Sequence, residues 1–353
     1  MSASLAGRDD HELLELAPSG ESRSTWSRNG VIQVDGRPVF VKRVPVTATE
    51  CRHLYSTRNH FNLPTFYQYG VGSAGFGAFR ELAALRAVTD LVLSGETSAF
   101  PLLYHHRVLP GHTGPWKGRM SLEDYVRFWA DNDAIASMMR ERMSADHELW
   151  LFIEHFPSTV SDWFMSDNQS QVDSVISQFS DALGVLRRHG FVHFDAHLAN
   201  MVTDGTSLFI ADFGLAVGSE FELTTPERSF AARHRHYDLG LALFSLDLIL
   251  TMHIQQQPQN VRADIDRACR EPGESDRAQI IARSVGYYRR VAEIIALAPA
   301  YVETLERVSE VTSYIDTLLH RLQAHPESAA DYRDTELLAR LRAVGLADLE
   351  EPD

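Results

Sequence analysis

The stretch FVHFDAHLANMVTDGTSLFIADFGLAV, residues 191–217, holds the most informative spacing of polar residues in the chain. The segment SLFIA within it is short and apolar, which predicts a β-strand and a hairpin-like return of the chain. That return brings Asn200 and Asp212 close together. The residues with fixed spacing are His193, Asp195, Asn200 and the run Asp212-Phe213-Gly214.

These residue types suit phosphoryl transfer. The reaction needs one carboxylate facing an acceptor hydroxyl and oxygen ligands that hold Mg²⁺ against the phosphates, because its transition state is stabilised mainly by position and charge. Asp195 suits the first role, and Asn200 and Asp212 suit the second. Each group alone is also typical of a plain turn or a cap. The combined order and spacing favour a function.

Two charged residues nearer the start of the chain extend this site. GVIQVDGRPVFVKRV, residues 30–44, alternates apolar and polar residues around an Asp-Gly turn, which predicts a β-hairpin with Lys42 on its second strand. FRELAALRAVTDLVL, residues 79–93, has helical spacing with Glu81 in its first turn. A strand lysine can bind the α and β phosphates while a helix glutamate holds the lysine, and Lys42 and Glu81 fit those roles.

The ordered set of strand lysine, helix glutamate, H-x-D-x-x-x-x-N and D-F-G resembles the protein-kinase-like superfamily. This superfamily includes eukaryotic-type protein kinases and phosphotransferases of the aminoglycoside and choline kinase type. The matches cover roughly residues 25–300. The resemblance implies a two-lobed α+β fold, in which a small antiparallel sheet with one key helix precedes a larger, mainly helical lobe. It also implies that ATP and Mg²⁺ bind in the cleft.

The resemblance assigns expected roles to single residues. Asp195 and Lys42 are expected to be catalytic, and Asn200 and Asp212 to be the metal ligands. The expected ATP-binding residues are Lys42, Glu81, Asn200, Asp212 and, at the hinge, Glu154 and Phe156.

Three further expectations come with the resemblance. Asp238 is expected to open the central helix of the large lobe and to support the catalytic loop, and His193 to be a packed scaffold residue. The separation of 39 residues between Lys42 and Glu81 is long for the superfamily. Glu50 therefore stays a rival partner of the lysine.

The pattern of the chain predicts three parts. Residues 1–24 are polar and Ser-rich and are expected to form a loose leader. Residues 25–156 are expected to form the sheet-containing lobe, with an inserted helix at about 120–146. Residues 157–353 are expected to form the helical lobe with the catalytic loop and the D-F-G segment.

Composition limits the partners. A formal net charge of −15 on 353 residues disfavours broad attraction to nucleic acid or to an anionic membrane. The two cysteines lie far apart, which favours a reducing compartment. The most apolar stretch, Leu239–Met252, is short and contains Asp247, and no secretory signal is visible. We therefore expect a cytoplasmic protein that neither inserts into a membrane nor binds nucleic acid.

The segment YGVGSAGFGAFRE, residues 69–81, contains a literal G-x-G-x-x-G, a pattern that can cradle phosphates. A kinase glycine loop comes before the lysine strand, whereas this segment comes after Lys42 and directly before the Glu81 helix. We therefore interpret it as a decoy, a flexible entry that lets the helix swing. The phosphates are instead expected beneath residues 24–36, where hydroxyl groups of Ser24, Thr25 or Ser27 replace missing glycines.

The sequence features that bear on the phosphoryl acceptor point in two directions. His197 gives a D-x-H pattern typical of small-molecule phosphotransferases, and Phe194 stands where many protein kinases have an arginine. The segment from Asp212 to Thr225-Pro226-Glu227 is short for peptide docking, whereas D-F-G followed by Leu-Ala is more typical of protein kinases.

These features favour a small or specialised hydroxyl acceptor. A serine/threonine protein kinase is one alternative, and a pseudokinase that binds a nucleotide or a partner is another. The run 233–237 is either a solvated turn or a contact for an anionic acceptor.

Overall fold

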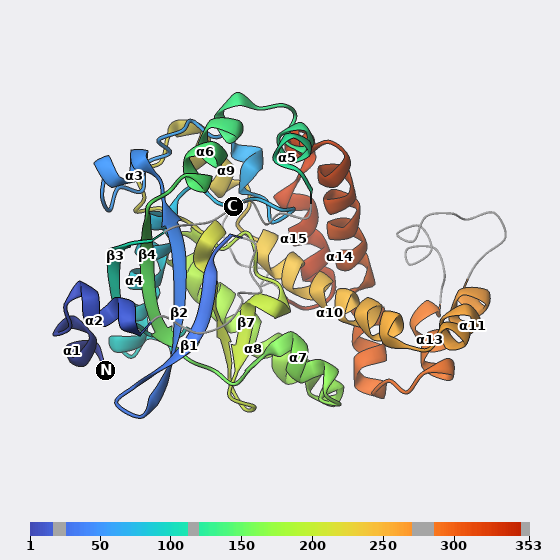
Figure 1. Cartoon of the computed structure of the whole chain (residues 1–353). Coiled ribbons are helices and arrows are strands. Elements are labelled where there is room, and N and C mark those ends of the chain that lie inside the picture. Colours follow the sequence, from blue (N-terminus) through green and yellow to red (C-terminus); the bar gives the residue numbers. More distant parts are fainter. Residues whose placement is uncertain (17–25, 112–119, 270–285, 347–353) are drawn as a thin grey trace.

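The computed structural model describes residues 1–16, 26–111, 120–269 and 286–346. Its first lobe is built on an antiparallel sheet of order β1-β2-β4-β3, at the left of Figure 1. Asp35 and Gly36 adopt positive φ angles of 51° and 74° in the turn between β1 and β2, as a tight two-residue hairpin requires. The strands of this sheet are β1 Arg28–Val34, β2 Arg37–Val46, β3 Leu103–Pro110 and β4 His147–Glu154.

One face of this sheet is covered by the start of the chain. Leu5 and Leu13 are fully buried and share a core cluster with Val34, Val39 and Phe152 of the sheet. The prediction of a loose leader is therefore wrong for residues 1–16, because two leucines in a polar sequence anchor two short helices; residues 17–24 lie outside the described chain. These helices are α1 Ser2–Ala6 and α2 Asp10–Glu15.

The inserted segment also differs from its prediction. Two helices, α5 Leu122–Phe128 and α6 Asp133–Met143, replace the single expected helix. The break falls at Ala130 and Asp131, which both have positive φ angles and so cannot continue a right-handed helix.

The other face of the sheet packs against α4, Ala78–Leu93, which also contacts the turn at Phe213–Leu215. The chain reaches α4 from β2 through α3, Ala48–Arg52, and a 3-10 turn at Thr65–Gln68. This helix therefore lies between the sheet and the loop that carries the D-F-G run.

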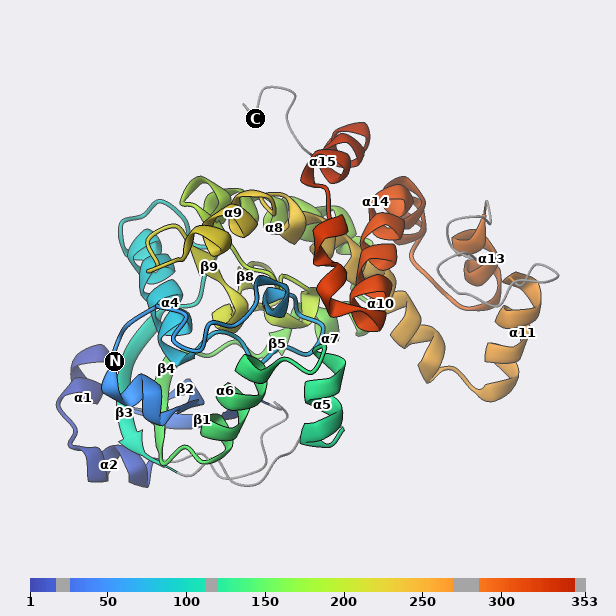
Figure 2. The ribbon, with the colours of Figure 1, turned by 90° about the horizontal axis from the view of Figure 1, so that it is seen from above.

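The second lobe is mainly helical, and Figure 2 shows its C-terminal helices on the side away from the sheet. Its helices are α7 Val160–Met165, α8 Val172–Arg188, α9 Thr225–Ala232, α10 Tyr237–Gln256, α11 Gln259–Cys269, α13 Tyr287–Ile294, α14 Pro299–Ala324 and α15 Asp334–Ala343. Its short strands are β5 Ser158–Thr159, β6 Phe191–Val192, β7 Met201–Thr203, β8 Leu208–Ile210 and β9 Val217–Gly218. The two-lobed α+β class expected from the sequence is confirmed.

Helix α10 runs through the middle of this lobe and packs against α8, α14 and α15. By length and composition it could cross a membrane, but 72% of its most apolar 18-residue window is buried inside the protein. Packing within the lobe accounts for its apolar composition.

Candidate active site

Lys42 lies at the centre of a buried charge cluster. Its Nζ donates hydrogen bonds to Oε1 of Glu81 at 2.6 Å and to Oδ1 of Asp212 at 2.7 Å. Burial alone would lower the pKa of Lys42, but the charges of Asp212 and Glu81 outweigh it and raise that pKa. The Asp212 side chain is 44% exposed, so the cluster is open on one side.

Glu50 bonds to two helix starts and not to Lys42. Its Oε2 accepts hydrogen bonds from the backbone and side chain of Thr47 and so caps α3. Its Oε1 accepts the backbone N–H of Ala78 at 2.7 Å, at the start of α4. The structure therefore pairs Lys42 with Glu81, and the rival Glu50 holds the end of the helix that carries Glu81.

Asp195 and Asn200 are in direct contact, and the β7–β8 hairpin returns the chain as predicted, so that the N–H of Ala211, next to Asp212, bonds to the backbone carbonyl of Asn200 at 2.9 Å. The side-chain nitrogen of Asn200 donates to Oδ2 of Asp195 at 2.8 Å and to its backbone oxygen at 3.0 Å. Nε2 of His197 lies 3.6 Å from the other carboxylate oxygen, Oδ1. Burial raises the pKa of Asp195, and the nearby His197 opposes this rise. A carboxylate with a raised pKa suits a proton acceptor.

The loop around Asp195 rests on two buried residues. Asp238, in the first turn of α10, accepts the backbone N–H groups of His193 at 2.6 Å and Phe194 at 2.8 Å. Burial raises the pKa of Asp238 to about 7, although both N–H donors favour its ionised form. His193 bonds through Nε2 to the carbonyl of Ala211 at 3.0 Å, and burial lowers its pKa to about 4. The expected supporting role of Asp238 and the scaffold role of His193 are confirmed.

The D-F-G run is held with its aspartate toward Lys42. Asp212 has a left-handed backbone, with φ of 58°. Phe213 is fully buried and its ring packs against His193 at 5.0 Å and Phe100 at 6.1 Å. Because the phenylalanine occupies the interior, the aspartate next to it faces the cleft.

The residues present fit a divalent cation only in part. Within the described ranges, no group of three or more His, Cys, Asp or Glu side chains could hold a metal by itself. The side-chain hydrogen bonds of Asn200 use its nitrogen, so its side-chain oxygen and the Asp212 carboxylate are the oxygen ligands of the kind that Mg²⁺ prefers. Mg²⁺ at nucleotide sites takes its other ligands from phosphates and water.

A cavity of about 140 Å³ adjoins these residues and has Lys42, Glu81, Asp195 and Asp212 in its wall. Ligand pockets usually have about 300–1,000 Å³, so this space corresponds to part of a nucleotide. Ser27 also lines the cavity, and its contact with phosphates stays a prediction. Ser24 and Thr25 lie outside the described residues.

The two expected hinge residues are not in the wall of this cavity. Glu154 ends β4, and its carboxylate accepts the backbone N–H of Leu102 at 3.2 Å. The ring of Phe156 packs against Phe209 at 4.1 Å. Their contact with a nucleotide stays a prediction.

The glycine segment, residues 69–77, is not a free entry to α4. A side-chain carbon on Gly70 would collide with Oδ1 of Asp195, and one on Gly75 would lie 2.5 Å from the carbonyl oxygen of Gly214. Tyr69 is fully buried, and its hydroxyl bonds to Nε2 of His234 at 2.5 Å. The expected swinging hinge is therefore a packed segment, although Gly70 and Gly72 do line the cavity at Lys42.

Sequence reasoning missed a second buried ion pair on α4. Arg80 donates to Oε1 of Glu227 in α9 at 2.6 Å. The run 233–237 is also more than a solvated turn, because His234 is buried and His236 bonds through Nδ1 to Asp334 at 2.7 Å. The aromatic and histidine content of that run was the available signal.

Comparisons with known proteins add a fold-level likeness. No protein-family model matches the sequence, and no curated protein matches it. A solved structure of WaaP in complex with acyl carrier protein is similar over 90% of this chain and 93% of that chain, with 16% identity and a TM-score of 0.38. At these values the likeness says nothing about activity.

Proposed function

We propose that the chain is an ATP-dependent phosphotransferase that acts on a hydroxyl group. One observation carries this proposal: Lys42 is in direct contact with both Glu81 and Asp212, and the three share one cavity with Asp195. A strand lysine, a helix glutamate and two aspartates in one cavity provide cationic charge, a metal ligand and a proton acceptor together.

The roles follow from the contacts. Lys42 neutralises phosphate charge, and Glu81 holds its ammonium group in place. Asp212 and the side-chain oxygen of Asn200 would hold Mg²⁺. Asn200 also fixes one oxygen of Asp195, which leaves Oδ1 to receive the acceptor proton.

Bound MgATP supplies the γ-phosphoryl group: the acceptor oxygen bonds to the γ-phosphorus as the bond to the bridging oxygen breaks, ADP leaves, and the acceptor proton passes to Asp195. The chain contributes position and charge. His193 and Asp238 hold the loop so that Asp195 does not have to reorganise during the reaction.

We infer a small or specialised acceptor rather than a general protein substrate. The short path from Asp212 to the start of α9 at Thr225 supports this inference, because it leaves little chain for docking a peptide. We also propose a cytoplasmic location. Cys51 and Cys269 are both free thiols, which agrees with a reducing compartment.

The small cavity at Lys42 favours a second candidate, a pseudokinase that binds a nucleotide or a partner without transferring phosphate. A nucleotide-dependent thermal shift with and without Mg²⁺, followed by measurement of ATP turnover, separates the two. Phosphotransfer predicts a Mg²⁺-dependent shift and turnover that Asp195→Ala abolishes. A shift without turnover supports a nucleotide-binding pseudokinase, and the absence of any shift contradicts both the phosphotransferase and the nucleotide-binding pseudokinase.

A further inference from the structure

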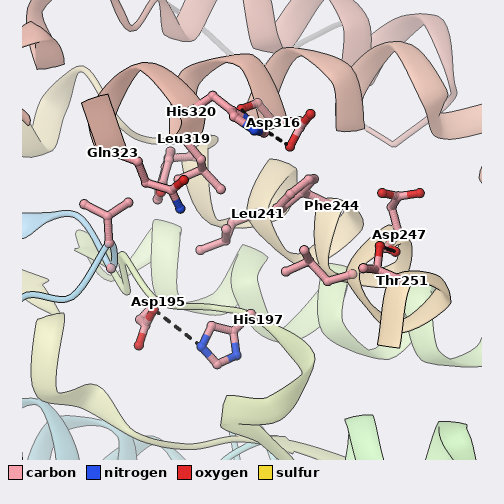
Figure 3. A pocket seen from close by; sticks show the side chains of 14 residues that line it. Asp195, His197, Leu241, Phe244, Asp247, Thr251, Asp316, Leu319, His320 and Gln323 are labelled. Atoms are coloured by element: carbon pink, nitrogen blue, oxygen red, sulfur yellow. Dashed lines mark hydrogen bonds and ion pairs between the residues drawn. The ribbon is translucent and has the colours of Figure 1, made fainter. Parts of the chain in front are cut away.

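A second cavity meets the first one at Asp195. It has a volume of about 370 Å³ and lies between α10 and α14, and Gly70 and Asp195 are part of the walls of both cavities. Figure 3 shows Asp195 and His197 on one side of this space, with side chains of α10 and α14 across from them. The volume is within the range of about 300–1,000 Å³ that is usual for small-molecule sites.

The wall of this second cavity combines apolar and acidic groups. Leu241, Phe244 and Leu319 supply apolar surface. Besides Asp195, the carboxylates of Asp247 and Asp316 line it, and its lining residues include no lysine or arginine. Two histidines, His197 and His320, also line it, and Nδ1 of His320 lies 3.3 Å from Oδ1 of Asp316. The wall therefore attracts a positively charged ligand and repels an anionic one.

A buried hydroxyl group gives an independent reason to expect a ligand. Tyr237 lines the same cavity and is fully buried, and its hydroxyl has no hydrogen-bond partner among the described residues. By contrast, the hydroxyl of Tyr301, buried on the neighbouring helix, donates to the carbonyl of Leu246 at 2.6 Å. Buried polar groups are nearly always satisfied, so the Tyr237 hydroxyl calls for a partner outside the described protein.

We propose that this second cavity binds the phosphoryl acceptor, and that the acceptor is a hydroxyl-bearing molecule with an apolar body and a cationic group. Its hydroxyl meets Asp195, Tyr237 positions it by a hydrogen bond, and Asp247 and Asp316 face the positive charge. This inference rests on the proposed phosphotransferase function for the identity of Asp195 as proton acceptor. The charge preference of the cavity is a separate property that binding alone measures.

Three para-substituted benzyl alcohols test the charge preference, because they share one ring and one hydroxyl. They carry an aminomethyl, a carboxamide or a carboxylate group, so that each has a single hydroxyl. Titration of the full chain by calorimetry, without nucleotide, is expected to show the ammonium compound binding about tenfold or more tighter than the carboxylate. Equal affinities, the opposite order, or no binding of the ammonium compound would overturn the proposal.

Two pairs of variants locate that binding. Asp316→Asn is expected to reduce the preference for the ammonium compound several-fold, whereas Asp173→Asn makes the same change of charge on the exposed surface of α8 and should leave it unchanged. Tyr237→Phe should weaken binding of all three alcohols without lowering the unfolding temperature, because it removes an unpaired hydroxyl. Tyr301→Phe should lower the unfolding temperature and leave binding unchanged. If Asp316→Asn and Tyr237→Phe leave binding unchanged, the cavity is not the site.

The experiment separates this inference from the proposed function. Binding with the expected charge order in a protein that never turns over ATP supports the ligand class and contradicts the phosphotransferase. Turnover of ATP with other acceptors, in a protein that shows no charge preference, supports the phosphotransferase and contradicts this inference. If the protein turns over ATP and also shows the expected charge preference, Tyr237→Phe should raise KM for the ammonium alcohol more than it lowers kcat.

Discussion

Two neighbouring residues of α4 form buried ion pairs of the same length in very different surroundings. Glu81 accepts a hydrogen bond from Lys42 at 2.6 Å, and Arg80 donates one to Glu227 at 2.6 Å. Arg80 is enclosed by protein: its Nε bonds to the carbonyl of Thr57 at 2.7 Å and its guanidinium lies 5.0 Å from the ring of Phe76. Length and burial alone would rank the two pairs as equals.

The difference lies in charge balance and access. Arg80 and Glu227 cancel each other, whereas Lys42 faces two carboxylates, Glu81 and Asp212, beside a cavity. Arg142 and Asp195 also line that cavity, so its wall holds three carboxylates against two cations. An excess negative charge next to open space suits a cation that arrives with a ligand. The neutral, enclosed pair instead joins α4 to α9 in the helical lobe. A functional ion pair is therefore recognised by an excess of charge of one sign beside a cavity.

The largest effect is expected at the unbalanced carboxylate. Asp212→Asn removes the charge that holds the metal, and phosphoryl transfer should fall on the order of 10³-fold or more while the fold is retained. Single-turnover transfer from labelled ATP, together with circular dichroism, measures both. Full activity in a folded variant would break the distinction between the two pairs.

Substitution of Lys42 should mainly reduce activity, whereas substitution of Arg80 should mainly reduce stability. Lys42→Met should lower turnover about 10²-fold. The loss of stability should be smaller, because one of the two carboxylates, Asp212, is 44% exposed and stays hydrated. Arg80→Met leaves Glu227 buried without its partner and should reduce the free energy of unfolding by about 3–5 kcal/mol. Denaturant unfolding and ATP turnover of both variants make the comparison. If Lys42→Met is the less stable of the two, Lys42 is mainly structural.

A smaller effect is expected for two glutamates, Glu81 in the first turn of α4 and Glu50 of α3, which accepts the N–H of Ala78. Glu81→Gln should lower turnover about tenfold, because the lysine is no longer held by a charge. Glu50→Gln should leave turnover nearly unchanged and cost about 1 kcal/mol of stability, as expected for a helix cap. The same activity loss in both variants would mean that Glu50 acts through the position of α4 and not only through its stability.

The smallest expected effect is a shift along the pH axis. Because the pKa of Asp195 is raised, its carboxylate gains a proton at higher pH than the usual value of about 3.9. The acid limb of kcat/KM should therefore lie above that value, with activity falling as the pH decreases through it. His197→Gln removes the charge that opposes the rise, so the limb should move to higher pH. A limb at the usual carboxyl value would argue against Asp195 as the proton acceptor.

The sequence predicted the features that depend on local spacing. The hairpin that carries Lys42 and the hairpin return from Asn200 to Asp212 follow from short patterns in a fixed order. The support of the loop by Asp238 was implied by the resemblance to the superfamily. The choice between Glu50 and Glu81 could not be made in this way. Both lie near a helix start, and only tertiary contacts show that one binds the lysine and the other caps the helix.

The sequence did not predict features that depend on contacts between residues far apart in the chain. The glycine segment has a motif-like string, but the groups that exclude side chains at Gly70 and Gly75 come from Asp195 and Gly214, far along the chain. The first two helices were missed because their polar composition conceals two buried leucines. Tyr237 could not be singled out, since nothing in a sequence shows that a tyrosine hydroxyl is left without a partner.

The burial of Tyr69 bears on how the chain can be divided. This residue precedes α4, yet its ring packs edge-on against Phe230 and Tyr237 of the helical lobe, with centroids 5.5 and 5.4 Å away. A protease cut near residue 156 would therefore leave two fragments that stay associated through that contact. A separately expressed fragment 1–156 would expose this aromatic surface and aggregate, and it should recover its fold only when it is mixed with the remainder of the chain.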